Sequence, residues 1–481
     1  MNRAPSTTTL PSPKGAAAMP EDQADINYAR AVSNGHYDVY TGGLSGKHDN
    51  VRSYWEDQIR GMTLRPHVLR LVDRSRRADK KVRIVDLGSG TGEGLRLLSS
   101  WRRAEEDLRL HRTRVLPHEV IDCYIGCDLC QAMVDQGNVN FADSPNVTFR
   151  QGDFSEGFPL TDEEPFDLYF STYGSFSHID DEAMERLLTE IVEHAGPRAL
   201  VVGDWLGRHS IEWPCYWGEP GDQMLSYSMN WLPSNGPGEE ADQFPMRFWL
   251  GDEIRSLVAR VAEKTKARVM VLGLYDCSVF VGRHMDTGQY NQWTNPVRAA
   301  VNRLHEQNVR TDLETVKVHL ASAEGHDELN RYYARLRYCW NNLVDYCQRR
   351  LEKGHHPHPV RLRDWQSFPP ALQIAIMTLD RVIDTVAWMR MGDPRANIIE
   401  PQLGYALRNL ELESQTGLGR GHALIGVLEI RKDADGTRGR LPQADQEAHD
   451  ITAPDDGKAG RAPAASDLEI SHGSPESLLQ G

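Results

Sequence analysis

The chain places an acidic residue directly before a series of closely spaced glycines. In the run Val82–Gly94, Asp86 is followed by Gly88, Gly90 and Gly92. Glycines carry no side chain, so they suit positions where a ligand must approach the backbone closely. The pattern therefore predicts a site for a nucleotide-like ligand.

A strand and a helix must position this loop. Val82–Leu87 has the apolar composition of a buried parallel strand. Gly94–Trp101 then predicts a helix, with leucines available to pack on the sheet. A strand, a glycine turn and a helix N-terminus together form the ligand crevice of a doubly wound α/β sheet. We therefore expect an α/β fold with the site at the end of this strand.

The spacing of the glycines excludes two common phosphate-binding motifs. The dinucleotide pattern G-x-G-x-x-G fails from Gly88, because Glu93 stands at its last position, and from Gly90, because Leu95 stands there. A phosphate loop also fails, since no Gly-Lys-Ser/Thr follows. The ligand is therefore expected to be bound by a different glycine loop.

The observed pattern resembles the first motif of class I S-adenosylmethionine (SAM)-dependent methyltransferases. The resemblance implies a doubly wound, seven-stranded Rossmann-like sheet with SAM as the cofactor. In that family the loop wraps the methionyl and ribose portion of SAM, and the acidic residue helps to hold the ammonium group. The resemblance thus implies cofactor contacts by Asp86, Gly88, Ser89, Gly90 and Gly92.

Two further strand ends support the resemblance. Asp128 ends the apolar run Val120–Asp128 and resembles the carboxylate that accepts hydrogen bonds from both ribose hydroxyls, with Leu129 beside it. A helix-capping aspartate is the alternative reading. Asp153 and Phe154 follow a third strand, where the family receives the adenine amino group and packs on the purine.

The residues expected to act on the methyl acceptor follow the fourth strand, Phe166–Ser171. The resemblance implies that Ser171 contacts the cofactor. His178 is the preferred base by its position and by the ordinary imidazole pKa of about 6.5, with Asp204 and Tyr173 behind it. A structural role for the histidine is the alternative.

The later part of the chain predicts the rest of the sheet and a helical half. Ala199–Trp205 suits a fifth strand, and Arg268–Leu274 with Asp276–Arg283 resembles the closing, antiparallel strand pair of the family. Asn295–Leu412 has long amphipathic repeats, and His422–Ile430 could be a last strand that re-enters a sheet. The helical half could serve as a lid, a recognition platform or a homodimer surface.

These observations divide the chain into five predicted parts. The tails 1–22 and 433–481 are expected to be disordered, because both are poor in large apolar residues and the second is acidic. Between them we expect an N-terminal helical cap at 23–78, a SAM-binding methyltransferase domain at 79–290 and a mainly helical domain at 291–432.

An aromatic insertion separates the fifth strand from the closing pair. It could form a wall that excludes water from the acceptor site, or it could simply cover the sheet. Its aromatic residues are Trp205, Trp213, Tyr216, Trp217, Tyr227, Trp231, Phe244, Phe248 and Trp249.

Two segments have the residue types of metal ligands. Cys123, Cys127 and Cys130 have the spacing by which radical SAM enzymes hold an iron-sulfur cluster. However, an extended strand would hold the first two about 13 Å apart. The segment Gly354–Pro359 contains three histidines, but its spacing is not that of known zinc folds, and a solvated loop is favoured. We therefore expect no metal site.

Composition limits the partners. The 481 residues contain 54 Lys and Arg against 69 Asp and Glu, a formal net charge of −15, which argues against nucleic acid as a partner. No apolar run approaches the length of a membrane span. Seven scattered cysteines do not form a disulfide framework, so we expect a cytoplasmic protein.

The favoured function is transfer of a methyl group from SAM to an oxygen, nitrogen or carbon of a small-molecule or peptide acceptor, in a biosynthetic pathway. One alternative is a radical SAM enzyme that uses the three cysteines. Another is a binding module that keeps the fold without catalysis. The sequence does not identify the acceptor.

Overall fold

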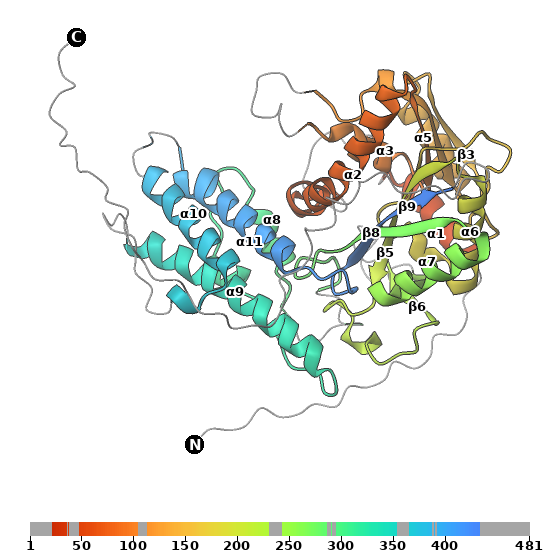
Figure 1. The fold of residues 1–481 in the computed structure, drawn as a ribbon. Helices are drawn as coiled ribbons and strands as arrows, with labels where there is room; N and C mark the ends of the chain where they lie inside the picture. The colour runs from red at the N-terminus through yellow and green to blue at the C-terminus, as the bar shows by residue number, and fades with distance from the viewer. Residues whose placement is uncertain are drawn as a thin grey trace, which may run out of the picture. The chain divides into compact units, whose positions relative to one another are not determined.

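In the computed structural model, five parallel strands form the centre of one sheet in the order β3-β2-β1-β4-β5 (Figure 1). Their bounds are β1 Val82–Leu87, β2 Ile121–Asp128, β3 Val147–Gln151, β4 Leu168–Phe170 and β5 Arg198–Gly207. Next to β5 runs β9 (Ala423–Arg431), antiparallel to it, and β8 (Arg268–Cys277) pairs with β9. This arrangement confirms the predicted doubly wound sheet, although two further strands that extend it from β5 bring the number among the described residues to nine rather than the expected seven.

The structure describes residues 22–35, 37, 48–103, 113–229, 243–285, 290, 295–353, 365–386, 389 and 392–432. Apart from Asp22, the two predicted tails lie outside the described residues, as does the histidine segment 354–359. The described residues up to Lys432 belong to one unit. Within them, no helix combines the length and the apolar character that crossing a bilayer would need.

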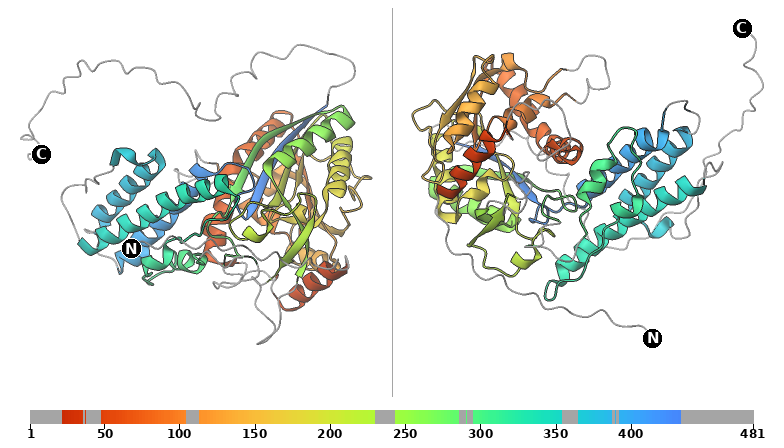
Figure 2. Two further views of the ribbon diagram at one scale, coloured as in Figure 1. Left: turned by 90° about the horizontal axis from the view of Figure 1, so that it is seen from below. Right: turned by 180° about the vertical axis from the view of Figure 1, so that it is seen from behind.

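Alternating apolar residues explain why the central strands carry helices on both faces (Figures 1 and 2). On β1, Ile84 belongs to one apolar cluster and Val85 to the other, because successive side chains of a strand point in opposite directions. The first cluster includes residues of α2 (Asp57–Arg77), α3 (Glu93–Ser100) and α5 (Gln131–Asn140), and the second includes residues of α6 (Asp181–His194) and α7 (Gly251–Thr265).

The predicted closing strand pair is wrong in its second member. The partner of β8 is β9, not Asp276–Arg283, because the chain leaves the strand after Cys277. Ser278 has a φ of +60°, a left-handed conformation that ends an extended strand. The carboxylate of Asp276 instead accepts the backbone N–H groups of Gly417 and Gly419, both at 2.8 Å. The end of β8 therefore holds the loop that brings β9 into the sheet.

The helical region lies between these two strands in the sequence. It contains α8 (Arg298–Arg303), α9 (Asp327–Lys353), α10 (Pro370–Val386) and α11 (Glu400–Ser414), of which α9, α10 and α11 pack against one another (Figure 2). Its apolar residues continue the cluster on the first face of the sheet, where Trp340 of α9 packs on Trp55 with ring centroids 5.5 Å apart.

Two segments far apart in the sequence lie over the carboxyl ends of the parallel strands. The hairpin of β6 (Met224–Ser228) and β7 (Gln243–Trp249) continues from the end of β5, with which β7 pairs in parallel. The N-terminal helix α1 (Asp22–Ser33) contacts both β7 and α5. A short π-helix, η2 (Arg52–Glu56), leads into α2.

Candidate active site

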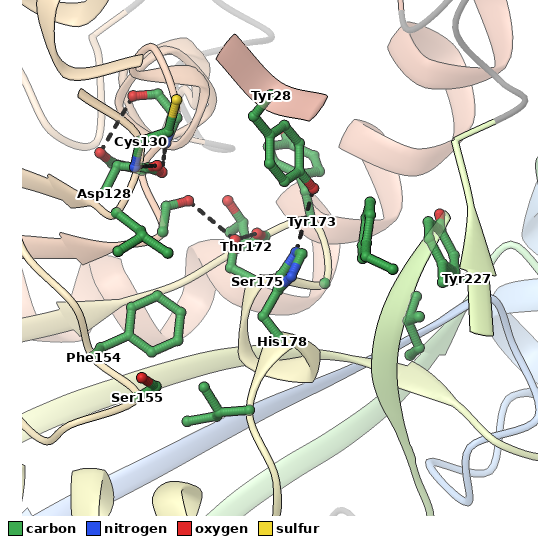
Figure 3. A pocket seen from close by; sticks show the side chains of 18 of the residues that line it. Tyr28, Asp128, Cys130, Phe154, Ser155, Thr172, Tyr173, Ser175, His178 and Tyr227 are labelled. Carbon is green, nitrogen blue, oxygen red and sulfur yellow. Dashed lines mark hydrogen bonds between the residues drawn. The ribbon is translucent and has the colours of Figure 1, made fainter. Parts of the chain in front are cut away.

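A cavity of about 830 Å³ lies at the carboxyl ends of the central strands (Figure 3). Nine of the residues predicted for the site line it, and they come from the ends of four strands: Gly88, Ser89, Gly90, Asp128, Leu129, Asp153, Phe154, Tyr173 and His178. Four predicted residues are not among the lining residues: Asp86, Gly92, Ser171 and Asp204. The strand ends thus bring most of the predicted site together, as a doubly wound sheet requires.

The glycine loop is tied to the second strand by its backbone. The N–H groups of Gly88 and Ser89 both donate to the carbonyl of Cys127, at 2.8 and 3.1 Å, and the N–H of Gly90 donates to Asp128 at 2.8 Å. Gly88 has a φ of +68°, and a Cβ atom there would lie 2.6 Å from Ser175. Only glycine meets both conditions without strain.

Asp86 lies beneath the loop rather than on the cavity wall. Tyr124 donates a hydrogen bond to its Oδ2, and its buried Oδ1 has no hydrogen-bond partner among the described residues. Burial raises the pKa of Asp86 to about 8 despite that hydrogen bond, and the charges of Asp128 and Glu93 raise it further. Near neutral pH the carboxyl group is therefore largely protonated.

Gly92 and Ser171 also lie behind the wall. A Cβ at Gly92 would lie 2.3 Å from the ring of Phe141, so this glycine allows close packing of the helix that follows. Ser171 is fully buried, and its hydroxyl donates to the carbonyl of Leu87 at 2.8 Å. Both residues shape the strand ends that carry the site.

Three carboxylates border the cavity near the loop. Asp128 accepts the N–H of Cys130 at 3.0 Å in addition to that of Gly90, so it caps the start of α5 as well as facing the cavity. Asp153 accepts the N–H of Ser155 at 2.8 Å, while Glu93 lies in the first turn of α3. Because each carboxylate oxygen has two lone pairs, Asp128 and Asp153 keep acceptor capacity toward the cavity.

Tyr173 and His178 line the middle of the cavity. Tyr173 has a φ of +60°, and the guanidinium of Arg52 lies 3.6 Å from the centre of its ring. The ring of His178 stacks on Phe244, and its Nε2 lies 3.3 Å from the hydroxyl of Tyr28 (Figure 3). Burial lowers the pKa of His178 to about 4, so the ring is neutral at physiological pH.

Asp204 is enclosed behind Tyr173. Its Oδ2 accepts hydrogen bonds from Arg60 at 2.9 and 3.2 Å and from the backbone N–H of Tyr173 at 2.9 Å. Only 1% of the residue is exposed, which separates it from an acceptor molecule in the cavity. Asp204 is thus placed to position the loop after β4.

Some residues of the aromatic insertion line the cavity, and others pack in the protein core. Tyr227 and Phe244 line the cavity, and Trp231 lies outside the described residues. The remaining members are buried in the protein core: Trp205, Trp213, Tyr216, Trp217, Phe248 and Trp249. The insertion therefore contributes both to the core and to the wall.

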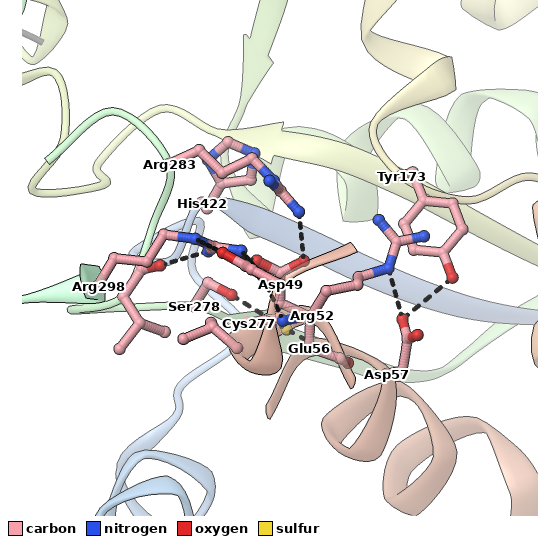
Figure 4. Close-up of polar contacts among 12 residues, drawn as sticks. Asp49, Arg52, Glu56, Asp57, Tyr173, Cys277, Ser278, Arg283, Arg298 and His422 are labelled. Atoms are coloured by element: carbon pink, nitrogen blue, oxygen red, sulfur yellow. Dashed lines mark hydrogen bonds and ion pairs between the residues drawn. The ribbon is translucent and has the colours of Figure 1, made fainter. Parts of the chain in front are cut away.

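Several lining residues were not predicted from the sequence. Arg52, Glu56 and Arg283 reach the cavity beside a cluster of ion pairs, in which Arg298 binds Glu56 at 2.7 Å (Figure 4). His422 lines the same end. No motif marks these residues, because their place depends on how η2 and β9 pack.

The three cysteines of the alternative motif have different surroundings. Cys123 and Cys127 lie on β2, whose extended conformation was predicted, and Cys127 packs with the core of the second face. Cys130 packs instead with Tyr37 and Met133. The strand assignment of this segment is confirmed.

Residues 113–198 match the sequence model of a family described as a methyltransferase domain. The match includes Asp128, Asp153 and Tyr173, which line the cavity from three successive strand ends. Over these residues the chain is similar to methyltransferase domains. A comparison with curated proteins finds no match.

The solved structures that are similar to this chain have low sequence identity to it. A complex titled "DhpI-SAM-HEP" is 14% identical, with 54% of this chain and 94% of that chain covered and a TM-score of 0.33. The CcbJ methyltransferase from Streptomyces caelestis is 12% identical, with 53% and 91% covered and a TM-score of 0.34. Magnesium protoporphyrin IX methyltransferase from Synechocystis PCC 6803 with bound SAH is 12% identical, with 53% and 93% covered and a TM-score of 0.32.

The residues present fit SAM, the methyl donor that the resemblance to methyltransferases implies. The left-handed backbone of Gly88 and Gly90 leaves the loop open to a ligand, with no side chain on the wall at these positions. Asp128 and Asp153 supply acceptors suited to ribose hydroxyls and an adenine amino group. When bound, SAM supplies an activated methyl group on a positively charged sulfur.

Proposed function

We propose that this domain transfers the methyl group of SAM to an oxygen, nitrogen or carbon of a small-molecule or peptide acceptor, in a biosynthetic pathway. The observation that supports the proposal is the continuity of the cavity. Gly88 and Asp128 line one part of it, while Tyr173, His178 and Tyr227 line the part beyond (Figure 3). Donor and acceptor can therefore meet inside one enclosed volume.

The volume supports a small acceptor. Ligand sites usually enclose roughly 300 to 1,000 Å³, and this cavity of about 830 Å³ lies in the upper part of that range. Such a site has room for an acceptor beside SAM. The formal net charge of −15 agrees with an acceptor that is not a nucleic acid.

The cavity wall supports the chemistry of a displacement at carbon. An acceptor atom must attack the methyl carbon in line with the breaking carbon–sulfur bond, and much of the rate comes from this alignment. Tyr28, Tyr227 and Phe244 offer aromatic surface that excludes water and tolerates a nearby positive charge. We assign these side chains to orienting the acceptor.

His178 is proposed to shape this wall rather than to move the proton. Its low pKa makes it a weak base, and its Nε2 already faces the hydroxyl of Tyr28. Tyr173, whose ring lies against Arg52, and the buried Asp204 are proposed to hold the loop that forms the floor.

Calorimetric titration of the purified protein with SAM and with S-adenosylhomocysteine tests the proposal. We expect saturable binding of both, followed by transfer of labelled methyl groups to members of a panel of phenols, alcohols, amines and short peptides. Absence of SAM binding would contradict the proposed function. Binding without transfer to any acceptor would favour the binding module instead.

A further inference from the structure

His422 lines the cavity and contacts a carboxylate with one of its ring nitrogens. Its Nδ1 lies 2.7 Å from Oε2 of Glu212, while its Nε2 has no hydrogen-bond partner among the described residues. The side chain is 16% exposed and lines the cavity at the acceptor end. Figure 4 shows it in the group that contains Arg283 and Ser278.

The direction of β9 explains this position. Because β9 runs antiparallel to β5, its first residue lies at the edge where the parallel strands end, and Ala423 pairs with Leu206. The N–H of His422 donates to the carbonyl of Ser278 at 3.1 Å, and Asp276 holds the loop before it. The histidine is thus fixed directly before a strand of the central sheet.

Glu212 is a fully buried carboxylate with a defined set of donors. Its Oε1 accepts the N–H of His284 at 2.5 Å, and the hydroxyl of Ser210 donates to Oε2 at 3.4 Å. Burial alone would raise the pKa of Glu212, but His422 and His284 outweigh it and hold the pKa below its ordinary value. The ionised carboxylate therefore favours a proton on Nδ1 of His422 and a lone pair on Nε2.

We propose that the Glu212–His422 pair takes up the proton that the methyl acceptor loses, an inference that rests on the proposed function. The acceptor is then a hydroxyl or amine group that reacts with loss of a proton. As its oxygen or nitrogen forms a bond to the methyl carbon, the carbon–sulfur bond breaks and its electron pair stays on sulfur. The proton moves to Nε2, and Glu212 stabilises the resulting imidazolium before the proton returns to solvent.

The other histidines at this end are less suited to this role. His284 is fully buried, and burial lowers its pKa to about 3. His178 has its Nε2 beside Tyr28. The remaining titratable groups that line this end are Tyr227, Arg283 and Glu56, the last two within the ion-pair cluster of Arg298.

Carbethoxylation by diethylpyrocarbonate tests the pair without an identified acceptor, because the reagent attacks neutral imidazole nitrogens. Peptide mass spectrometry would measure the modification rate of each histidine from pH 5 to 8. We expect His422 to react faster than His178 and His284. In Glu212→Gln, the rate for His422 at neutral pH should fall at least about threefold, because the carboxylate that holds the proton on Nδ1 and leaves the lone pair on Nε2 is lost. An unreactive His422, or an unchanged rate in Glu212→Gln, would overturn the pairing.

Methyl transfer then tests the proton acceptor itself, with the panel of labelled acceptors described above. For His422→Gln we expect kcat to fall at least about 100-fold, with recovery as the pH rises and the acceptor ionises by itself. The dissociation constant of SAM should change less than about twofold. Full activity of His422→Gln would overturn the inference while leaving the proposed function intact.

The experiments distinguish a failure of the proposed function from a failure of the proposed role of His422. If wild-type protein does not bind SAM, the proposed function fails regardless of His422. If Glu212→Gln does not fold, as judged by its thermal unfolding, His422→Gln still provides the kinetic test, because the side chain of residue 422 is partly exposed and a glutamine amide can still donate a hydrogen bond to Glu212.

Discussion

Arg60 on α2 forms a buried ion pair with Asp204 on β5, in which two guanidinium nitrogens lie 2.9 and 3.2 Å from one carboxylate oxygen. The side chains are 4% and 1% exposed. The same oxygen accepts the backbone N–H of Tyr173, whose left-handed conformation would otherwise be unfavourable. One contact thus links α2, the fifth strand and the cavity floor.

Removing one partner of this pair should strongly destabilise the protein. For Arg60→Ala we expect a loss of about 3 to 5 kcal/mol in the free energy of unfolding, because Asp204 would remain buried without its counter-charge. Urea unfolding measures the change. Arg260→Ala, which breaks the more exposed pair with Glu185, should cost at most about 1 kcal/mol. Equal losses in the two variants would contradict the assigned role.

Asp128 should contribute to cofactor affinity. Asp128→Ala removes a carboxylate acceptor from the cavity wall, and we expect the dissociation constant of SAM to rise at least about tenfold, since hydrogen bonds to charged groups contribute about 1.5 to 3 kcal/mol. Calorimetry below the unfolding transition measures it. Asp122→Ala, at an exposed position of the same strand, is the control and should bind SAM as wild type does.

The two later glycines of the loop should respond differently to alanine. At Gly90 a Cβ would meet nothing closer than Glu93 at 3.5 Å, so Gly90→Ala should cost about 1 to 2 kcal/mol from its left-handed backbone alone. At Gly92 the Cβ would also overlap Phe141 and Phe149, and the loss should be larger. Thermal unfolding of both variants measures the difference. A smaller loss at Gly92 would show that the two rings move aside.

Asp86 should make stability depend on pH. Its folded pKa of about 8 lies above its ordinary value, so the folded protein binds a proton that the unfolded chain releases. Stability contributed by this group is present at low pH and decreases as the pH rises from about 4 to 8, by at most about 1.4 kcal/mol per pH unit. Asp86→Asn should remove this slope in urea unfolding at pH 5 to 8. Parallel pH curves for the two proteins would show that the folded carboxyl is already ionised.

The helical region should unfold together with the sheet. Trp55 and Trp340 pack in one apolar cluster that runs from the first face of the sheet to α9, and Glu411 of α11 accepts the N–H groups of Ser278 and Val279 at 2.7 and 3.0 Å. We expect a single calorimetric transition whose van't Hoff and calorimetric enthalpies agree. Two separated transitions would contradict this coupling.

The local sequence was sufficient for the strands and loop that bind the cofactor. The apolar run of β1 with its glycine turn, and the aspartates after β2 and β3, depend on neighbours close in sequence. The cofactor half of the cavity could therefore be predicted from periodicity and spacing.

The residues that line the acceptor half of the cavity could not be predicted from the sequence, because their positions depend on packing between segments far apart in the chain. His422 reaches the cavity only because β9 is antiparallel, and periodicity does not encode strand direction. The strands β8 and β9 pair although the whole helical region separates them in the sequence. The segment Asp276–Arg283 follows β8 directly and has a similar apolar pattern, so it was predicted as the partner instead. Asp204 was predicted to face the acceptor. The sequence around this strand end does not reveal that Arg60 of α2 packs against the carboxylate and encloses it.

The late position of β9 has a consequence for synthesis on the ribosome. More than 200 residues separate the end of β5 from the strand that covers its open edge. At roughly 5 to 20 residues per second, the nascent sheet waits roughly 10 to 40 s with that edge exposed. During this interval the chain presents unpaired backbone groups to other nascent chains and chaperones, and the cavity acquires His422 only after the helical region has been synthesised.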